Sequence, residues 1–271
     1  MAADQTIVVT GASSGIGREL ALQLASPGRR IWLIARNPER LEEVATLVRQ
    51  RGASAEVVSL DLSDLEESSS FLEKHFPPSV RVDELYLVSA ITEFGEVKDT
   101  LIEDWNLIYR TNLLAPVQWI LHFYRNMTEI RAGRIVIVSS LAAYTGYPTA
   151  TVYATMKAAL LGVYRSLVHE ANVYQVRLHL CSPGYVDTNI YKTALFRNTS
   201  YEKTMKMIGG MGFPVLSARD ASARIIRSTR AGSNEGVFPF YASALAWLAP
   251  RVPWLIGFIH RKIIRDFHRI P

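Results

Sequence analysis

The chain has 271 residues, 49% hydrophobic and 20% charged, which excludes a disulfide-stapled miniprotein and a disordered charged tail. Its single cysteine, Cys181, excludes an internal disulfide and favours a reducing compartment. The net charge is +5, but the basic side chains are scattered without interleaved stacking aromatics, which argues against nucleic acid as a partner. The first residues lack the basic stretch and long apolar run of a signal peptide, so we expect a cytoplasmic protein.

Short β-branched runs alternate along the chain with helical patterns. We expect strands at Ile7–Val9, Ile31–Ile34, Glu56–Ser59, Leu85–Ser89, Ile135–Ser139, Val176–Cys181 and near 237–240. We expect helices near 15–25, 38–50, 64–75, 101–127, 152–172 and 218–230. Apolar strands each followed by an amphipathic helix predict a doubly wound parallel sheet, a three-layer α/β Rossmann fold.

The sequence predicts one domain with an extension. Residues 1–240 form the domain, and no repeat or low-complexity linker divides it. Within it, residues 185–214 are rich in glycine and are expected to form a mobile flap rather than sheet. Residues 241–271 form an apolar and basic helical extension.

A glycine-rich turn, Thr10–Gly17, follows the first strand and opens a helix at Arg18. Glycines at 11, 15 and 17 let the backbone turn sharply and let a pyrophosphate approach the helix N-terminus. A glycine trio alone is a weak signal, and the spacing differs from the usual G-x-G-x-x-G. Its position after the first strand is what predicts a dinucleotide site.

The end of the second strand bears on which dinucleotide binds. An acidic residue there would accept from a ribose 2′-hydroxyl, but Ala35 supplies none. Arg36 instead carries a guanidinium group that can pair with a phosphate through two hydrogen bonds, so we expect NADP(H) rather than NAD(H). The alternative is that Arg36 is a solvated surface arginine. Asp61, followed by Leu62, either meets the adenine edge or caps the next helix, and both readings stay open.

A set of polar residues points to proton-transfer chemistry. Tyr153 and Lys157 are four residues apart, which places a phenol and an ammonium on one helical face. Ser140 ends the fifth strand, at the edge of a parallel sheet where ligands bind. Asn112 is a polar residue in an otherwise apolar helical stretch, where it either marks a kink or serves the site.

These residues together resemble the short-chain dehydrogenase/reductase family in order and spacing over about residues 5–240. The chain departs from the family where Asn-Asn-Ala-Gly is usual, because Leu87–Ala90 stands there. We expect a compensating contact to brace that strand end. The matching features are Thr10–Gly17, Asn112 with Leu113 and Leu114, Ser140, Tyr153 with Lys157, Pro183 with Gly184, and Thr188.

The resemblance implies roles for this set. Tyr153 is the general acid in reduction and the base in oxidation, Ser140 hydrogen-bonds the substrate oxygen, and Asn112 holds a water that links Lys157 to solvent. Lys157 also binds the nicotinamide ribose, and its ammonium, together with the positive charge of the oxidised nicotinamide, is expected to lower the phenol pKa. The cofactor-binding set is Gly11, Ser13, Ser14, Gly15, Ile16, Gly17, Arg36, Asp61, Leu62, Ser89, Ala90, Tyr153, Lys157, Pro183, Gly184, Val186 and Thr188, and no metal is expected.

The segments expected to contact substrate are apolar and aromatic. They favour an apolar ketone or secondary alcohol over a sugar or a phosphorylated acid, although these side chains could also pack internally. The expected substrate residues are Ser140, Leu141, Tyr147, Tyr153 and Tyr185.

The extension is too interrupted to span a bilayer as one helix, because Val252–Ile259 gives only eight residues free of charge against the about 20 required. Three readings of residues 241–269 stay open: a membrane-surface segment, a subunit contact and a lid. The family resemblance implies a homodimer or homotetramer through the helices at 101–127 and 152–172. Their apolar positions also suit burial against the sheet.

The sequence therefore predicts an NADP(H)-dependent oxidoreductase that interconverts an apolar ketone and a secondary alcohol. One alternative is a membrane-surface reductase of a long-chain 3-oxo lipid. The other is a non-catalytic NADP(H)-binding regulator.

Overall fold

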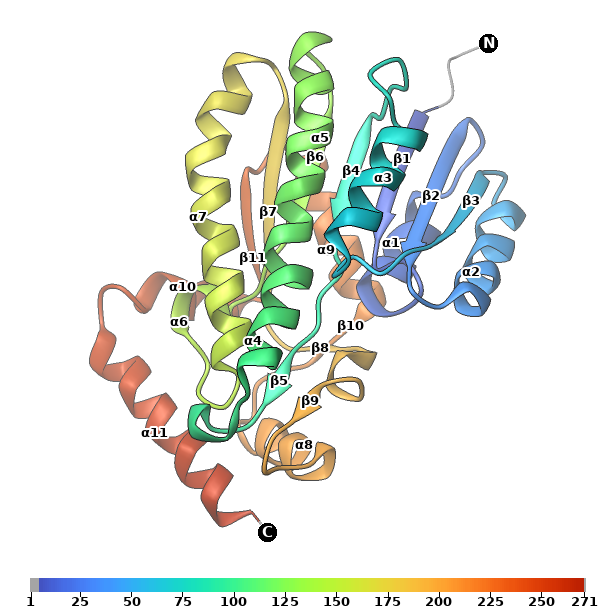
Figure 1. The fold of residues 1–271 in the computed structure, drawn as a ribbon. Coiled ribbons are helices and arrows are strands. Elements are labelled where there is room, and N and C mark those ends of the chain that lie inside the picture. Colours follow the sequence, from blue (N-terminus) through green and yellow to red (C-terminus); the bar gives the residue numbers. More distant parts are fainter. Residues whose placement is uncertain (1–4, 271) are drawn as a thin grey trace.

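A parallel sheet forms the frame of the molecule. In the computed structural model, which describes residues 5–270, seven strands lie in the order β11-β7-β6-β4-β1-β2-β3, and every neighbouring pair is parallel (Figure 1). All seven expected positions hold a strand, and the Rossmann fold is confirmed. The strands are β1 (Gln5–Thr10), β2 (Arg29–Ala35), β3 (Ser54–Ser59), β4 (Glu84–Leu87), β6 (Arg134–Val138), β7 (Arg177–Pro183) and β11 (Glu235–Phe238).

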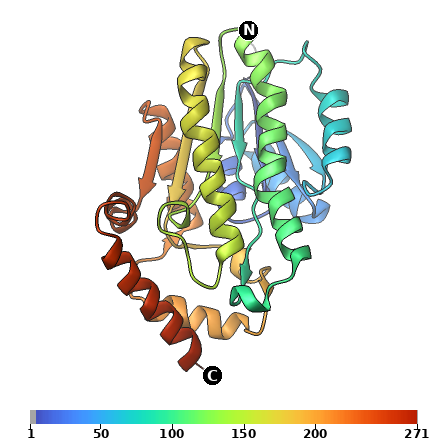
Figure 2. The ribbon, with the colours of Figure 1, turned by 60° about the vertical axis from the view of Figure 1, so that its left-hand side comes forward.

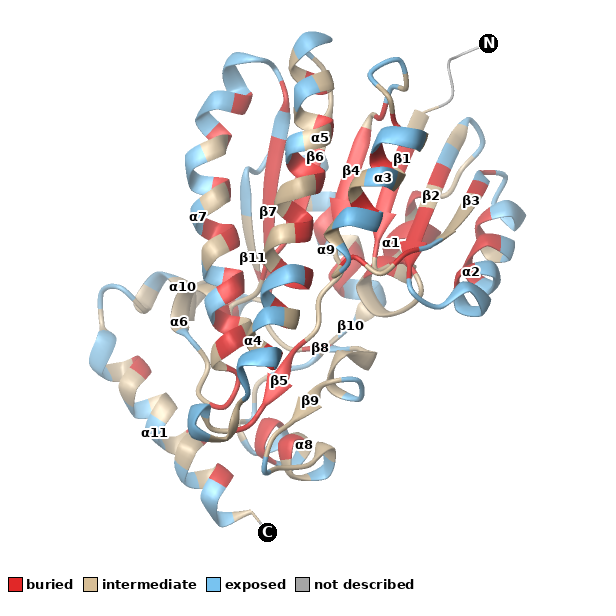
Figure 3. Ribbon diagram, in the orientation of Figure 1, coloured by how far each residue is buried: buried red, intermediate tan, exposed pale blue. Residues whose placement is uncertain are grey.

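Helices cover both faces of this sheet (Figures 1 and 2). One face carries α1 (Gly15–Leu24), α2 (Pro38–Gln50) and α9 (Ala218–Arg230). The other carries α3 (Leu65–His75), α5 (Ala115–Glu129) and α7 (Thr151–Val173). The sheet is therefore buried on both sides, as Figure 3 shows for β1, β4 and β7.

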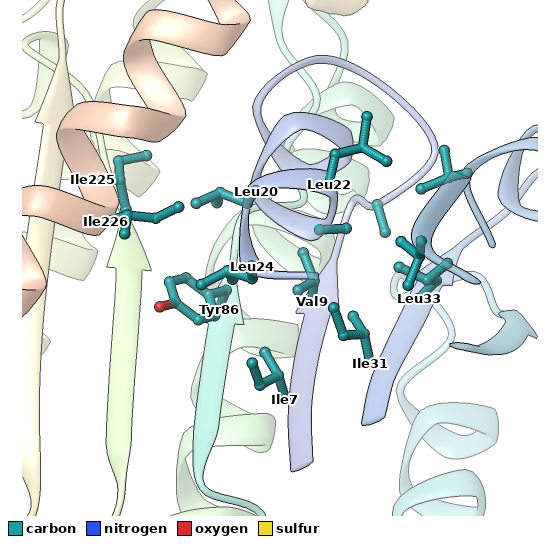
Figure 4. Packing of buried hydrophobic residues seen from close by; sticks show 14 of the residues in the cluster. Ile7, Val9, Leu20, Leu22, Leu24, Ile31, Leu33, Tyr86, Ile225 and Ile226 are labelled. Carbon is teal, nitrogen blue, oxygen red and sulfur yellow. The ribbon is translucent and has the colours of Figure 1, made fainter. Parts of the chain in front are cut away.

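Successive side chains along each strand point to opposite faces of the sheet, so each strand contributes to the hydrophobic core on either face. Ile7 and Val9 of β1 point to the α1 side, while Val8 between them joins the core on the other side. Figure 4 shows Ile7 and Val9 under Leu20 and Leu24 of α1.

The order of the strands indicates which edge of the sheet binds a ligand. The chain runs outward through β1, β2 and β3, then restarts beside β1 with β4 and runs the other way. In open parallel sheets the carboxyl ends of the strands at such a reversal form a crevice that binds ligands. The ends of β1 and β4 are therefore where a site is expected.

The expected flap, residues 185–214, contains two short strands, so the expectation that it holds no sheet is wrong, while its mobility stays a prediction. β8 (Val186–Asp187) pairs with β10 (Leu216–Ser217), and β9 (Leu195–Phe196) pairs with β5 (Glu93–Phe94). The helix α8 (Tyr201–Gly210) follows β9, and its Thr204, Met207 and Ile208 are buried. Burial of these side chains packs α8 against the fold, and the glycines that suggested a flap end the helix.

The long helix expected over 101–127 is divided. α4 (Ile102–Tyr109) and α5 are joined by a wide π-helical turn, Arg110–Leu114. This turn holds Asn112 fully buried inside the molecule. Asn112 therefore lies where the helical pattern becomes irregular, and both readings of it, a kink and a role in the site, stay open.

The apolar positions of α5 and α7 face the sheet. Trp119, Ile120, Phe123, Leu160 and Tyr164 are buried in the core on that side. Of the two readings for them, burial against the sheet is the one the structure shows. They give no argument for a dimer, and a homodimer or homotetramer stays a prediction.

The extension consists of α10 (Phe240–Leu248) and α11 (Pro253–Arg269), which run along the outside of the molecule (Figure 2). Within residues 5–270, no single helix has the length and hydropathy to cross a bilayer. α10 and α11 meet those criteria only as a pair, and they are bent by 119°.

Candidate active site

The glycine-rich turn brings three backbone segments together. Gly11 and Gly15 have φ angles of +69° and +52°, which favour glycine. A Cβ on Gly17 would lie 2.2 Å from the Gly11 carbonyl oxygen, and one on Gly11 would lie 3.0 Å from the Ser89 nitrogen. The absence of side chains thus lets β1, α1 and the segment after β4 converge at the helix N-terminus, a cradle that suits a pyrophosphate. Ser13, Ser14 and Ile16 line the same cleft.

Substitution of Gly17 tests this close packing. We expect Gly17→Ala to prevent accumulation of soluble folded protein, because its methyl group would meet backbone that has no room to move. Gly162→Ala in α7 is the matched control: its Cβ meets nothing within 4 Å, so it should raise the free energy of unfolding by about 0.5–1 kcal/mol. Soluble yield and thermal unfolding measure both; a well-folded Gly17→Ala protein would contradict the packing argument.

Two arginines lie at one end of the cleft. Arg36 follows β2 and is exposed there, as expected, and Arg40 in the first turns of α2 lines the same cleft. Asn37 caps α2, its side chain accepting from the Arg40 backbone N–H at 2.7 Å. Arg40 was not predicted from the sequence, although it follows Arg36 by four residues at the start of a helix.

Asp61 lines the cleft beside buried Leu62. Its carboxylate accepts hydrogen bonds from the backbone N–H and the hydroxyl of Ser63, at 2.9 and 2.8 Å. The cap of α3 is Asp64 instead, which accepts from the N–H groups of Glu66 and Glu67. Of the two readings left open for Asp61, the helix cap is wrong, because the cap residue lies three residues later and the helix begins at Leu65.

The strand end that lacks the family's asparagines is braced by Thr10. Its hydroxyl oxygen accepts from the backbone N–H groups of Val88 and Ser89, at 2.9 and 3.2 Å. This is the compensating contact that the sequence could not name. Ser89 and Ala90 line the cleft next to the glycine-rich turn.

The polar set converges on one wall of the cleft. Tyr153 and Lys157 both point from α7 into it, and Ser140 follows β6. The Ser140 side chain accepts from the Ala142 N–H at 3.2 Å and lies close enough to Tyr153 to influence the pKa of its phenol. Buried Lys157 donates from Nζ to the Val138 carbonyl at 2.9 Å and lies 5.7 Å from the centre of the Tyr153 ring.

The pKa values of this pair move in opposite directions. Burial raises the pKa of Tyr153 to about 12, with Ser140 opposing the shift and the nearby Glu93 carboxylate adding to it. The Lys157 ammonium is held against the Val138 carbonyl. That this ammonium and an oxidised nicotinamide together lower the phenol pKa stays a prediction for the complex with cofactor. Burial also lowers the pKa of Lys157 to about 8. At neutral pH the phenol therefore keeps its proton.

Asn112 is set behind the cleft and does not line it. Its side-chain oxygen accepts from the Ile91 N–H at 2.9 Å, and its amide donates to the Ile91 carbonyl at 2.8 Å. The π-helical turn thereby holds the segment after β4. One N–H and one lone pair of the amide remain for the expected water relay.

Glu93 is a buried carboxylate that the sequence analysis missed. It belongs to β5 and is fully buried at the N-terminus of α7. Its Oε1 accepts from the Val152 N–H at 2.7 Å, and its Oε2 accepts from the Tyr153 N–H at 3.2 Å. These two hydrogen bonds hold the first turn of the helix that carries Tyr153. Burial raises the pKa of Glu93 to about 7, although the hydrogen bonds oppose that shift.

The far end of the cleft is aromatic. The expected substrate residues Leu141, Tyr147 and Tyr185 line it with Ser140 and Tyr153, and the Tyr185 hydroxyl donates to Tyr147 at 3.1 Å. Further side chains there that the sequence analysis did not single out as contacts are Phe94, Tyr191 and Ile208. Pro183, Gly184, Val186 and Thr188 also line the cleft.

Comparison with known proteins identifies the family. Residues 5–197 match the family model described as short chain dehydrogenase. The chain belongs to the short-chain dehydrogenase family. It is 31% identical over 219 residues to a 3-oxoacyl-acyl-carrier-protein reductase of Aggregatibacter actinomycetemcomitans, covering 78% of this chain and 87% of that protein.

Solved structures agree on the fold. A short-chain dehydrogenase from Sphingobium yanoikuyae in complex with NADPH has a TM-score of 0.79 at 20% identity, covering 94% of this chain and 95% of that one. One from Burkholderia phymatum in complex with NAD has a TM-score of 0.83 at 19% identity, covering 93% and 95%. The protein is an oxidoreductase of the short-chain dehydrogenase family.

The residues of this family member fit a nicotinamide dinucleotide. All the residues expected to bind cofactor line the one cleft, which passes from the arginines, over the glycine cradle, to Tyr153. A Cβ at Gly17 or Gly11 would close the cradle. The cofactor fits because the cleft has room for it at the glycine-rich turn and because the N-terminus of α1 favours an anion.

Proposed function

We propose that this short-chain dehydrogenase uses NADP(H) to interconvert an apolar ketone and a secondary alcohol. The observation that carries the proposal is that Tyr153 and Ser140 line the cleft together, where Tyr153 packs with a cluster of aromatic side chains. The charged side chains Arg36, Arg40 and Asp61 follow β2 and β3, at the other end. The two charged groups beside Tyr153, Lys157 and Glu93, are buried and already hydrogen-bonded to the backbone. An apolar substrate group is desolvated there more favourably than a charged one.

The chain's own residues handle the proton. NADPH, when bound, supplies a hydride to the carbonyl carbon. Tyr153 is protonated at neutral pH and donates its proton to the carbonyl oxygen, while the Ser140 hydroxyl donates a hydrogen bond that stabilises the developing negative charge. Lys157 is held at the Val138 carbonyl by a buried hydrogen bond, which fixes its ammonium beside the phenol.

The experiment is a substrate panel with each cofactor. Purified protein is given NADPH or NADH with apolar ketones, aryl diketones and 3-oxoacyl compounds, and cofactor oxidation is followed by absorbance. NADPH oxidation coupled to alcohol formation from apolar ketones supports the proposal. Preference for charged or sugar-like carbonyls would contradict the substrate assignment.

The preference for NADP(H) rests on Arg36 and Arg40. We expect Arg36→Ala to raise KM for NADPH about 10- to 100-fold through loss of a charged hydrogen bond to the 2′-phosphate, with KM for NADH unchanged. Arg30→Ala is the matched control, since Arg30 is exposed on β2 outside the cleft. Equal effects on both cofactors, or a wild-type preference for NADH, would overturn the assignment.

A second candidate substrate is a long-chain 3-oxo lipid. Met205 and Met211 pack with the aromatic side chains at the far end of the cleft, and methionine adapts to extended apolar chains. The bacterial relative named above is a 3-oxoacyl reductase. If kcat/KM rises steadily with acyl length, the lipid is favoured over a compact ketone. The non-catalytic regulator is excluded by turnover of any member of the panel.

A further inference from the structure

The two faces of α11 have different partners. Its inner face carries Ile256, Ile263 and Phe267, all buried. Ile263 and Phe267 pack on Met207 of α8 and on Tyr147, which lines the cleft. This inner face anchors the helix to the rest of the fold.

The outer face of α11 is aromatic at one end and basic at the other. Trp254, Phe258, Arg261 and Arg265 are exposed and follow one another at spacings of four, three and four, which places them on one stripe of the helix. Trp254 is 71% and Phe258 56% exposed. Figure 3 shows the same helix exposed along its length, with few buried positions. A face that met only water would not begin with two large aromatic side chains.

α10 and the turn after it carry further exposed aromatic and basic side chains. Phe240 is 87% and Trp247 59% exposed, and the Arg251 guanidinium lies 4.3 Å from the centre of the Trp247 ring. We call the exposed set Phe240, Trp247, Arg251, Trp254, Phe258, Arg261 and Arg265 the outer surface.

Charge is concentrated in the same segment. Residues 240–271 contain five basic side chains and one acidic one, a net +4, while the whole chain carries +5. Lys262 is paired with Asp266 at 2.7 Å, so the positive charge that remains lies on arginines. The arginines Arg251, Arg261 and Arg265 belong to the outer surface.

We propose that the outer surface of α10 and α11 docks on an anionic lipid bilayer. Tryptophan and phenylalanine partition into the headgroup region, and arginines beside them attract acidic headgroups. A second copy of the chain is the weaker occupant, because a two-fold contact through this surface would bring arginines of one sign together. This docking does not depend on the proposed reaction. It places the bilayer one helix away from α8, whose Ile208 lines the cleft.

The test is sedimentation of the full chain with vesicles of phosphatidylcholine alone or mixed with phosphatidylglycerol. We expect binding to the mixed vesicles, weakened by salt. Trp254→Ser with Phe258→Ser, and separately Arg261→Glu with Arg265→Glu, should each lower the partition coefficient about tenfold or more. The matched control is Ile102→Ser with Leu121→Ser, which removes exposed apolar side chains from α4 and α5 and should leave binding unchanged. Unchanged thermal unfolding checks that each variant folds.

Three outcomes would overturn the proposal. Equal binding of wild type and the α11 variants would mean that another surface meets lipid. Absence of vesicle binding, together with a change of mass in sedimentation equilibrium for Trp254→Ser with Phe258→Ser, would make the surface a subunit contact. Protein that stays with vesicles through an alkaline carbonate wash would be inserted in the bilayer rather than docked on it.

Discussion

Tyr153→Phe is expected to lower kcat for ketone reduction by about 10²–10⁴-fold while leaving the dissociation constant for NADPH nearly unchanged. The substitution keeps the ring, which packs among Ala150, Tyr185 and Ile208, and removes only the hydroxyl that gives the proton. Because Ser140 remains, hydrogen bonding to the substrate oxygen is retained and some turnover persists. Steady-state kinetics and fluorescence titration with NADPH measure the two quantities.

Tyr164→Phe is the matched control for this variant. Tyr164 lies on the same helix but is buried in the core against the sheet, outside the cleft. It should leave kcat within about twofold, since surface or core substitutions outside a site act mainly on stability. Near-normal turnover by Tyr153→Phe would mean that Tyr153 is not the proton donor.

Glu93→Gln should change how the stability of the protein depends on pH. Burial raises the pKa of Glu93 from 4.5 to about 7, so the folded state holds this proton more tightly than the unfolded state. The stabilisation is fully present below the unfolded pKa and is lost as pH rises through about 7. Over that window, wild type should lose on the order of 3 kcal/mol of unfolding free energy that the glutamine variant does not lose. Thermal unfolding across this range measures it.

The same substitution should move the pH profile of catalysis. The Glu93 carboxylate helps to raise the Tyr153 pKa, so its removal should shift the alkaline limb of reductive kcat to lower pH. Glu43→Gln, exposed on α2, controls for the loss of one negative charge. If the two variants have the same stability and kinetic profiles, Glu93 is not coupled to Tyr153.

The strands and the Tyr153 set could be predicted because their signals are local. Each strand is an apolar run, and Tyr153 and Lys157 share a helical face by spacing alone. The glycine-rich turn likewise combines its motif with its position after β1. These features depend on no contact between distant parts of the chain.

The features that were missed depend on distant contacts. Glu93 caps α7 from 59 residues away, so nothing beside it in the sequence marks it as buried. Thr10 braces Val88 across 78 residues, which is why the departure from the family pattern could be noticed but not explained. The structure of the segment around α8 comes in the same way, from pairing of β9 with β5 and from packing against α11.

The most direct test of the account is the ratio of kcat/KM values for NADPH and NADH during reduction of an apolar ketone at neutral pH. We expect alcohol formation with NADPH in strong preference to NADH. Turnover only with NADH would contradict the assignment of Arg36 and Arg40. No turnover of any ketone or 3-oxoacyl compound, by protein that binds NADPH tightly, would contradict the central claim that Tyr153 reduces an apolar carbonyl.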